Sequence, residues 1–319
     1  MNTNEYRLEP NAIDDSEIDL FKFLLILFQG KWIIIAVTTI TSIFAVIYSL
    51  SLPNIFESKA ILAPNDYSQN QSSLMQSYSN IASIAGLNLP SQASDSNSVK
   101  AREKIKSLSF FEDHIMPNIF LPELMAVKTW NSDLNKLIFD QNIFDENTKT
   151  WVRPYNYPQR LIPSGQESFK QFNKNFSISI DRQTGFVNIS IKHQSPEISK
   201  KWVDLVIKEI NYLYRLKDRT ESEKTVDYIN QKLSESSLTE INGILVRLLQ
   251  QEMQRLLFIE ANDFYVFEYI DAPRIMEQKT EPQRSLICIL GAIIGIFLGA
   301  IIVLIRYIGF RDKKFIYET

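Results

Sequence analysis

Residues of the types and spacing that catalysis or metal binding needs are scarce in this sequence. The two histidines are His114 and His193, and no cysteine or histidine stands at a metal-ligand spacing from either. Ser195 directly precedes Pro196, where a serine is better explained as a helix N-cap than as a nucleophile. Acidic residues are plentiful, but no pair stands out as a general acid and base. We therefore expect no catalytic residue, no metal site and no cofactor, with both histidines at ordinary surface or turn positions.

Composition and charge exclude further classes of protein. The chain has 319 residues, a formal net charge of -3 and a pI of about 5.6. It has no basic stripe with interleaved aromatic residues, so no nucleic-acid partner is expected. No Gly-x-x-x-x-Gly-Lys phosphate loop is present, which argues against an energy-coupled enzyme. The single cysteine, Cys288, allows no intrachain disulfide.

Three glycines supply the most distinctive spacing in the chain. Gly291, Gly295 and Gly299 lie four residues apart, so on a helix they share one face and permit the backbone of another helix to approach closely. The pattern predicts packing against the other apolar segment of this chain, against a neighbouring subunit or against a partner protein. The plainer explanation is that glycine is common in membrane helices, but the repeated spacing favours packing.

These glycines lie in one of two strongly apolar stretches that contain no charged residue. The stretches cover residues 32–52 and 285–305, and a helix of about 20 apolar residues spans the hydrocarbon core of a bilayer. The first stretch follows several acidic residues and lacks a small-x-small cleavage pattern, so we expect an anchor rather than a cleaved signal peptide. Lys31, Trp32 and Arg306 border the two stretches and are predicted to anchor them at the membrane interface.

The charges beside the two spans predict the orientation of the chain. Basic residues gather in the tail 306–319, at Arg306, Arg311, Lys313 and Lys314. Because positive charge stays on the cytoplasmic side, both termini are predicted in the cytoplasm at a bacterial inner membrane, with residues 53–284 in the periplasm. Within the tail 1–31, the apolar segment 16–29 predicts a helix lying on the inner leaflet, or equally a helical extension of the first span.

Hydrophobic periodicity predicts an α+β domain between the spans. Alternating apolar residues on both sides of a turn with Gly185 are typical of an antiparallel hairpin. Residues 65–99, rich in Ser, Asn and Gln, predict loops and short helices. The other expected elements are a strand at 56–62, a helix at 99–108 followed by buried Phe110 and Phe111, a hairpin of 176–180 with 186–191, and a returning strand at 264–270.

Residues 196–262 form the longest predicted element. The segment has no proline after Pro196 and one glycine, Gly243, and its apolar residues recur every three or four positions. Unbroken, this helix spans roughly 100 Å at 1.5 Å per residue. A rod of that length cannot be buried in one domain, so we expect it to project from the membrane and pack against copies of itself. The alternative is a hairpin of two helices, broken near Ser234–Thr239.

Two prolines precede the second span. Proline fixes the φ angle and lacks a backbone donor, so it resists both helix formation and sheet pairing. Pro273 and Pro282 therefore predict a stiff connector that transmits tilting of the outer domain to the membrane helix. A plain turn is the alternative explanation for each proline taken singly.

Several short motifs follow one another in an order that one known family shares. They are Asp19-Leu-Phe21 with Lys31-Trp32, the strand at 56–62, Ile84-Ala-Gly-Leu87, Ser107-Leu-Ser-Phe-Phe111, Ala272-Pro273, Pro282-Gln-Arg284 and the three glycines. This succession resembles the Wzz-type chain-length determinants, the polysaccharide co-polymerases that lack a kinase domain. One departure is that residues 274–281 contain no proline, where that family usually has one.

The resemblance implies an architectural and regulatory function. It implies a bell-shaped homo-oligomeric ring, often octameric, of α+β periplasmic domains held by membrane helices in lipid. Such a ring would work with the O-antigen polymerase on undecaprenyl-diphosphate-linked polysaccharide and fix the modal chain length of lipopolysaccharide without catalysis. Co-polymerases for enterobacterial common antigen and for capsular or exopolysaccharide are alternatives. A two-span periplasmic sensor or adaptor would need a cytoplasmic output module, and a membrane-anchored hydrolase would need converging titratable groups.

Overall fold

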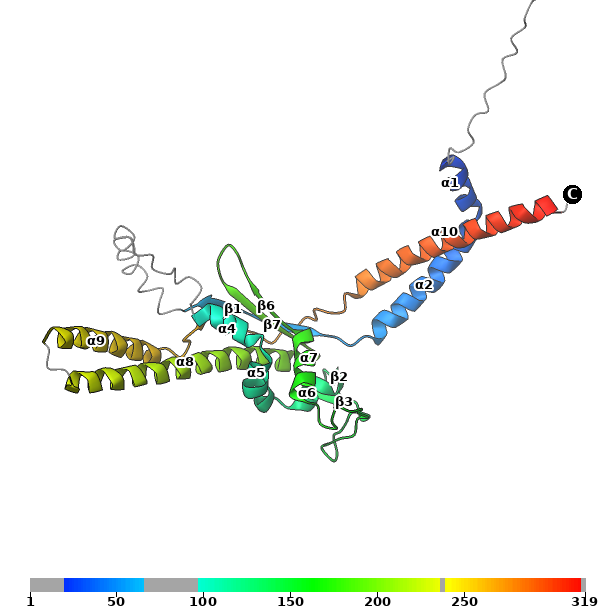
Figure 1. Cartoon of the computed structure of the whole chain (residues 1–319). Helices are drawn as coiled ribbons and strands as arrows, with labels where there is room; N and C mark the ends of the chain where they lie inside the picture. Colours follow the sequence, from blue (N-terminus) through cyan, green and yellow to red (C-terminus); the bar gives the residue numbers. More distant parts are fainter. Residues whose placement is uncertain (1–19, 66–96, 236–238, 317–319) are drawn as a thin grey trace, which may run out of the picture. The chain divides into compact units, whose positions relative to one another are not determined.

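The protein, seen here as a computed structural model, is described for residues 20–65, 97–235 and 239–316. The chain forms two compact units, which are treated separately below (Figure 1). The apolar-helix unit combines the two ends of the chain, up to Leu52 and from Pro282 onward, and the sheet unit is Pro53–Glu281. Most of the loop region predicted at 65–99, including the motif at Ile84–Leu87, lies outside the described residues.

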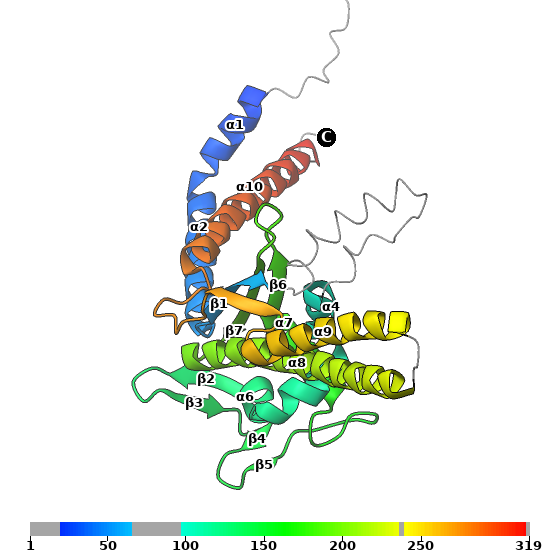
Figure 2. The same ribbon diagram turned by 90° about the vertical axis from the view of Figure 1, so that its left-hand side faces the viewer.

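The described residues of the apolar-helix unit form α1 (Leu20–Gln29), α2 (Lys31–Ser51) and α10 (Arg284–Ile316). Helices α2 and α10 lie side by side (Figures 1 and 2), and each is long and apolar enough to cross a membrane. Helix α10 continues beyond residue 305, where the second span was expected to end. A turn at Gly30 divides α1 from α2, so these are two helices and not one continuous extension.

A four-stranded antiparallel sheet, in the order β6-β7-β1-β8, is the centre of the sheet unit. The predicted hairpin and the predicted strand at 56–62 are confirmed. The hairpin turn contains Gly185 at a φ of 75°, a left-handed conformation that glycine adopts without strain. The strands are β1 (Phe56–Pro64), β6 (Phe176–Ile180), β7 (Val187–His193) and β8 (Phe267–Asp271).

Strand β8 begins at Phe267, not at Phe264 as the apolar pattern predicts. The backbone N–H groups of Val266 and Phe267 donate to the side-chain oxygen of Asn211, at 2.7 and 2.9 Å. Asn211 is itself buried, on the long helix that covers the sheet. A side chain from a helix therefore takes the hydrogen bonds that a neighbouring strand would otherwise supply.

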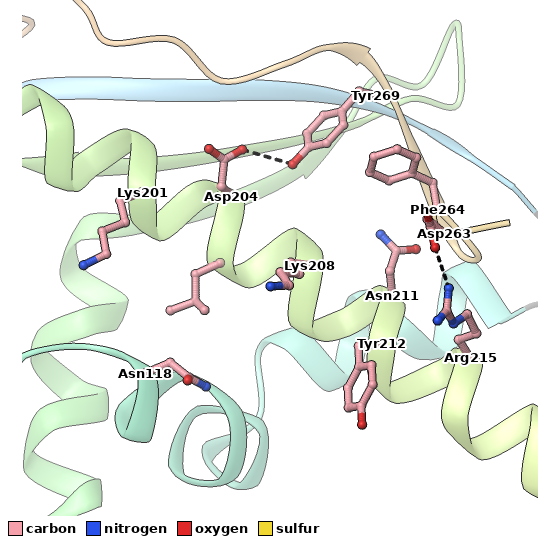
Figure 3. A pocket seen from close by; sticks show the side chains of 11 residues that line it. Asn118, Lys201, Asp204, Lys208, Asn211, Tyr212, Arg215, Asp263, Phe264 and Tyr269 are labelled. Carbon is pink, nitrogen blue, oxygen red and sulfur yellow. Dashed lines mark hydrogen bonds and ion pairs between the residues drawn. The ribbon is translucent and has the colours of Figure 1, made fainter.

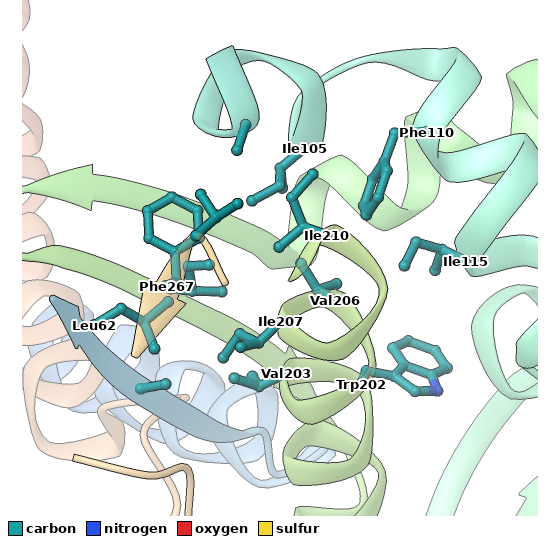
Figure 4. Close-up of a cluster of buried hydrophobic side chains, with 14 of the residues drawn as sticks. Leu62, Ile105, Phe110, Ile115, Trp202, Val203, Val206, Ile207, Ile210 and Phe267 are labelled. Carbon is teal, nitrogen blue, oxygen red and sulfur yellow. The ribbon is translucent and has the colours of Figure 1, made fainter. Parts of the chain in front are cut away.

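Helix α8 (Pro196–Glu235) packs its apolar face on this sheet. Figure 4 shows Trp202, Val206 and Ile210 on successive turns of α8, with Leu62 and Phe267 coming from the strands. All five side chains are at most 1% exposed. Full burial of one large apolar side chain contributes about 1.5–3 kcal/mol, so this contact between helix and sheet dominates the hydrophobic stabilisation of the unit.

The rod predicted over residues 196–262 is instead a helical hairpin. Helix α9 (Thr239–Ala261) lies alongside α8 in both views (Figures 1 and 2), so the unbroken helix is wrong and the break near Ser234–Thr239 is correct. Helix α8 alone has 40 residues and spans about 60 Å. An ion pair between Arg219 of α8 and Glu260 of α9, at 3.0 Å, is one of the contacts that join the two helices.

The chain between Asn97 and Asn175 adds short helices and two small hairpins. The helix predicted at 99–108 corresponds to α4 (Asn97–Ile105), and Phe110 and Phe111 are buried as expected. The remaining elements have no counterpart in the expectation from sequence. They are α5 (Leu108–Phe110), η2 (Phe111–Ile115), η3 (Met116–Asn118), α6 (Leu121–Met125), β2 (Val127–Asn131), β3 (Lys136–Phe139), β4 (Phe144–Asp145), β5 (Thr150–Trp151) and α7 (Gly165–Asn175).

Candidate functional site

The three glycines of the second apolar stretch lie on the face of α10 that contacts α2. A Cβ atom at Gly295 would lie 2.8 Å from the Cα of Thr38, and one at Gly299 would lie 2.8 Å from the Cα of Ile34. Backbone atoms of a helix cannot turn aside as a flexible side chain can, so glycine is needed for this separation. We call Gly291, Gly295 and Gly299 the glycine seam. The structure thus places the seam against the first apolar helix of the same chain, while its importance for function stays a prediction.

The seam has small residues on both sides. A Cβ atom at Gly291 would overlap the Cβ of Ala45 on α2. At the other end of the helix pair, Gly30 has the same relation to Val303 of α10. Close backbone approach therefore extends over most of the length of the two helices, which is the packing that drives helix association in an apolar solvent.

Two threonines of α2 line the seam without presenting a free hydroxyl donor to it. The Thr38 hydroxyl donates to the backbone oxygen of Ile34 at 2.8 Å, and the Thr41 hydroxyl donates to that of Val37 at 3.1 Å. Each hydroxyl proton is thus used within its own helix. At the seam these side chains act through their small size, and not as a polar lining.

The predicted interface anchors lie at the ends of the two candidate membrane spans, Lys31–Ser51 and Arg284–Tyr307. Lys31 opens α2, and its ammonium lies 5.3 Å from the centre of the Phe28 ring. Trp32 is 75% exposed, and Arg306 is exposed in the last part of α10. Exposed Trp, Lys and Arg beside an apolar helix suit a lipid headgroup layer. Their anchoring role stays a prediction.

The two predicted connector prolines differ in their surroundings. Pro273 is buried in the sheet unit, directly after β8. The next residue is held by the buried Ser58 hydroxyl, which donates to the Arg274 backbone oxygen at 2.9 Å. Pro282 is half-buried and begins the chain segment of the apolar-helix unit. We infer that packing in the sheet unit holds Pro273 in position, whereas a plain turn would not require the proline to be buried.

The end of the connector is bonded to the residue that precedes β1. The N–H of Ile55 donates to the Glu281 oxygen at 2.9 Å, and the N–H of Thr280 donates to the Ile55 oxygen at 2.8 Å. The Glu281 carboxylate also pairs with Lys192 of β7 at 2.6 Å and raises the pKa of that lysine. The entry to the sheet unit and the exit from it are therefore tied together, as a connector that transmits tilt would require.

A buried polar cluster, which sequence reasoning missed, joins α8 to its neighbours. Asp218 of α8 is 3% exposed and accepts hydrogen bonds from the Asn97 amide at 2.6 Å and from the Tyr265 hydroxyl at 2.7 Å. Arg255 of α9 completes the cluster, 3.3 Å from the same carboxylate. Burial, together with the nearby carboxylate, raises the pKa of Tyr265 well above its usual value. The cluster fixes α4, α9 and the segment before β8 to one point on α8.

A groove of about 580 Å³ runs along α8 (Figure 3). Its lining combines cations, aromatic rings and amides, and two carboxylates within it are already bonded. The Asp204 carboxylate accepts from the Tyr269 hydroxyl at 3.1 Å, and Asp263 pairs with Arg215 at 2.7 Å. We call this the α8 groove; it is lined by Asn118, Lys201, Asp204, Leu205, Lys208, Asn211, Tyr212, Arg215, Asp263, Phe264 and Tyr269.

His193 is not the surface or turn residue that was expected. It ends β7 and is 7% exposed, because it follows Ile189 and Ile191 on the buried face of the strand. Its Nδ1 accepts from the Ser195 N–H at 2.9 Å, and its Nε2 lies 2.9 Å from the Glu123 backbone oxygen, a pairing that suits the neutral ring. Burial lowers the pKa of His193. The histidine is a structural link between β7, α6 and the start of α8.

Another pair of titratable groups forms a structural ion pair. Glu167 forms a two-point pair with Arg153, which lowers the pKa of the carboxyl. Within residues 20–65, 97–235 and 239–316, no group of three His, Cys, Asp or Glu side chains is placed to hold a metal ion. The geometry described so far is that of packing surfaces and structural ion pairs.

A family match adds to this picture. The protein-family sequence model described as "Wzz: Chain length determinant protein" matches residues 16–115. The resemblance to the Wzz-type chain-length determinants is confirmed. The Wzz match covers less than half of the chain, and it includes α1, α2, β1 and the short helices up to Ile115.

Solved structures similar to this chain include two polysaccharide co-polymerases. One, titled a full-length bacterial polysaccharide co-polymerase, is 15% identical, with a TM-score of 0.39, and the match covers 92% of this chain and 99% of the other. The second is a fragment of WzzB from Salmonella Typhimurium, 14% identical, with a TM-score of 0.26 and coverage of 72% and 100%. No curated protein sequence matches this chain.

Proposed function

We propose that this chain is a co-polymerase that sets the modal chain length of a surface polysaccharide, foremost lipopolysaccharide O-antigen, without catalysing its synthesis. The observation that carries the proposal is the Wzz family match over residues 16–115. The two apolar helices, packed together through the glycine seam, supply the membrane anchor that such a protein needs. The alternative substrates are enterobacterial common antigen and capsular or exopolysaccharide.

The proposed location is a bacterial inner membrane, with the sheet unit in the periplasm and both ends of the chain in the cytoplasm. Support comes from the basic residues of the tail 306–319 together with Lys31, since Lys and Arg near membrane helices are retained on the cytoplasmic side. In this orientation the sheet unit is on the side of the membrane where lipid-linked glycan is polymerised.

Self-association into an octamer-like ring is part of the proposal. Its support is a row of exposed apolar side chains on α9: Val246, Met253 and Leu257 are 44%, 46% and 66% exposed. Their spacings of seven and four residues place them on one helix face. A soluble surface rarely leaves such a row uncovered, so we infer that a second copy of the chain packs against it. The proposed partners of the ring are the O-antigen polymerase and the undecaprenyl-diphosphate-linked polysaccharide.

The decisive experiment is complementation. The chain would be expressed in a Gram-negative strain that lacks its own chain-length determinant and keeps its O-antigen polymerase, and the lipopolysaccharide would be separated on a gel. We expect the random, decaying ladder to become a cluster of bands around one modal length. A strain carrying the empty vector is the control for the random ladder.

An unchanged ladder, with the protein confirmed in the membrane, would contradict the O-antigen assignment. The same comparison in the native host, with the gene deleted and restored, would then test the alternative polysaccharides. Loss of length control for one of them would reassign the substrate. If no polysaccharide changed, the co-polymerase function itself would be refuted.

A further inference from the structure

The cations of the α8 groove are arranged along a line. Lys201, Lys208 and Arg215 are seven residues apart, close to two full helical turns, so they share one face of α8. Successive members of this row are separated by roughly 10 Å along the helix axis at 1.5 Å per residue. The cations are thus spread along the groove, whereas a phosphate cradle would make them converge on one point.

One carboxylate of the groove, Asp263, neutralises Arg215 at the end of this row, and the other, Asp204, pairs with Lys200, which is not part of the row. Asp204 is bonded to Lys200 at 2.7 Å and to the Tyr269 hydroxyl, and Asp263 is bonded to Arg215. In the part of the chain that the structure describes, Lys208 has neither an ion-pair nor a hydrogen-bond partner. Lys208 therefore stands in the middle of the groove as a cation available to a ligand.

Aromatic rings stand beside the cations. Tyr212 and Phe264 are 53% and 44% exposed, although large aromatic side chains such as these are usually mostly buried. Figure 3 shows Phe264 on one side of α8 and Tyr212 on the other, with Asn211 between them and Lys208 beside Asn211. Aromatic faces with a few placed polar groups are typical of a pocket for a small or chain-like ligand. The apolar faces of sugar rings pack on such aromatic side chains.

We propose that the α8 groove binds a segment of an acidic polysaccharide, with single carboxylates of uronic-acid sugars facing Lys208 and the neighbouring Lys201. The inference rests on the proposed function, since it names the kind of glycan that the co-polymerase would contact. A second copy of this chain is the competing occupant. Exposed lysines argue against it, because lysine is depleted in the buried core of protein interfaces.

The test is direct binding to the full-length protein in lipid nanodiscs. The probes are a pentamer of galacturonic acid and, as its uncharged counterpart, maltopentaose. We expect the acidic pentamer to bind more tightly than maltopentaose, and its affinity to fall as salt is added. Lys208→Glu should weaken binding of the acidic pentamer about tenfold, through loss of a charge-assisted contact and new repulsion.

Two further variants sharpen the test. Lys224→Glu makes the same charge change at an exposed lysine of α8 outside the groove, and it should bind the acidic pentamer like the wild type. Tyr212→Ala keeps every charge and removes an exposed ring, and it should also weaken binding. Because all three side chains are exposed, unchanged thermal unfolding is expected and serves as the check on folding.

Three results would overturn the inference. They are equal affinity for the acidic and neutral pentamers, equal affinity of Lys208→Glu and wild type, and a change of oligomer mass in Lys208→Glu with unchanged glycan binding. The last result would identify the groove as a contact between copies. The binding assay does not depend on length control. Acidic pentamer binding with no polysaccharide changed in the complementation tests would therefore support the groove and contradict the proposed function alone.

Discussion

The helical hairpin of α8 and α9 depends on Asp218, and replacing this residue tests how the hairpin is held. The Asp218 carboxylate is bonded to Asn97, Tyr265 and Arg255, from three separate segments. Asp218→Asn keeps the shape of the side chain and one acceptor oxygen but removes the charge that faces the guanidinium. We expect the sheet unit to be destabilised and α9 to be the first element to loosen.

The magnitude follows from the burial of the two charges. Removing one partner of a fully buried ion pair costs about 3–5 kcal/mol, because the other charge is left without compensation. The Arg255 side chain is 28% exposed and the Asp218 side chain 5%, so water offsets part of this cost. We therefore expect Asp218→Asn to lower the free energy of unfolding by about 2–3 kcal/mol, discounted from the buried-pair value.

Urea unfolding of the full chain in detergent, followed by tryptophan fluorescence, measures this loss. Trp202 is fully buried in the sheet unit and reports its unfolding. Asp227→Asn is the matched control, because Asp227 is an exposed aspartate on the same helix. The midpoint for Asp218→Asn should fall by roughly 1 M, and that of the control should stay in place.

Hydrogen exchange provides a second readout of the same variant. The amides of α9 should exchange faster in Asp218→Asn, while those of β1 and β7 change less, because the lost charge is the one that pairs with Arg255 of α9. Equal midpoints for Asp218→Asn and Asp227→Asn, with unchanged exchange in α9, would refute the conclusion that this cluster holds the hairpin.

Two further predictions concern the glycine seam and His193. Replacing the three seam glycines by leucine should force α2 and α10 apart, at a cost of about 1–3 kcal/mol per overpacked site, and should broaden the glycan length distribution. The control is Gly243→Ala, where an added Cβ meets nothing within 4 Å, and it should leave the distribution unchanged. An unchanged distribution in the triple variant at normal expression would refute the role of the seam. Burial lowers the pKa of His193 below 6.5, so as pH falls the unfolded chain binds a proton before the folded chain does, and the free energy of unfolding should fall below about pH 6.5. Urea unfolding from pH 7.5 to 5 measures this loss, which should be smaller in His193→Gln. An equal loss of stability in the variant and the wild type would contradict the prediction.

Much of the sheet unit follows from local sequence patterns. The alternation on either side of Gly185 specifies both the hairpin and its register, because a shift of one residue would turn Ile189 and Ile191 away from the core. The same alternation, continued by two residues, places His193 on the buried face. Its burial was therefore available from the sequence, and the expectation of a surface position overlooked it.

Other elements were missed although a local signal was present. Helix α7 begins after Ser164, whose hydroxyl accepts from the Glu167 N–H at 3.3 Å. Ser164 and Glu167 have the spacing of a capping box, which marks a helix start in the sequence alone. The small hairpins β2–β3 and β4–β5 have weaker patterns, with mixed exposure along short strands.

The break between α8 and α9 has no such local signal, because the helical period of apolar residues persists on both sides of it. Apolar residues recur with helical spacing up to Ile259, so the period fits one rod as well as two helices. What separates the alternatives is the meeting of Asp218 with Arg255 and of Arg219 with Glu260, residues far apart in the chain. Charges on a long helix are usually solvated, so nothing in the local sequence indicates that these residues pair across the hairpin.

For the glycine seam, the packing face of the helix could be predicted from the sequence, but the partner helix could not. The four-residue spacing specifies which face of α10 packs closely, because this property belongs to one helix alone. The partner depends on α2, where Ile34, Thr38 and Ala45 meet the glycines. Thr38 and Thr41 of α2 are polar, yet their hydroxyls are bonded within their own helix and at the seam the structure uses their small size. Small residues at Thr38, Thr41 and Ala45 are a signal of the same kind on α2, whereas Ile34 is not, so the sequence indicates only part of the partner face.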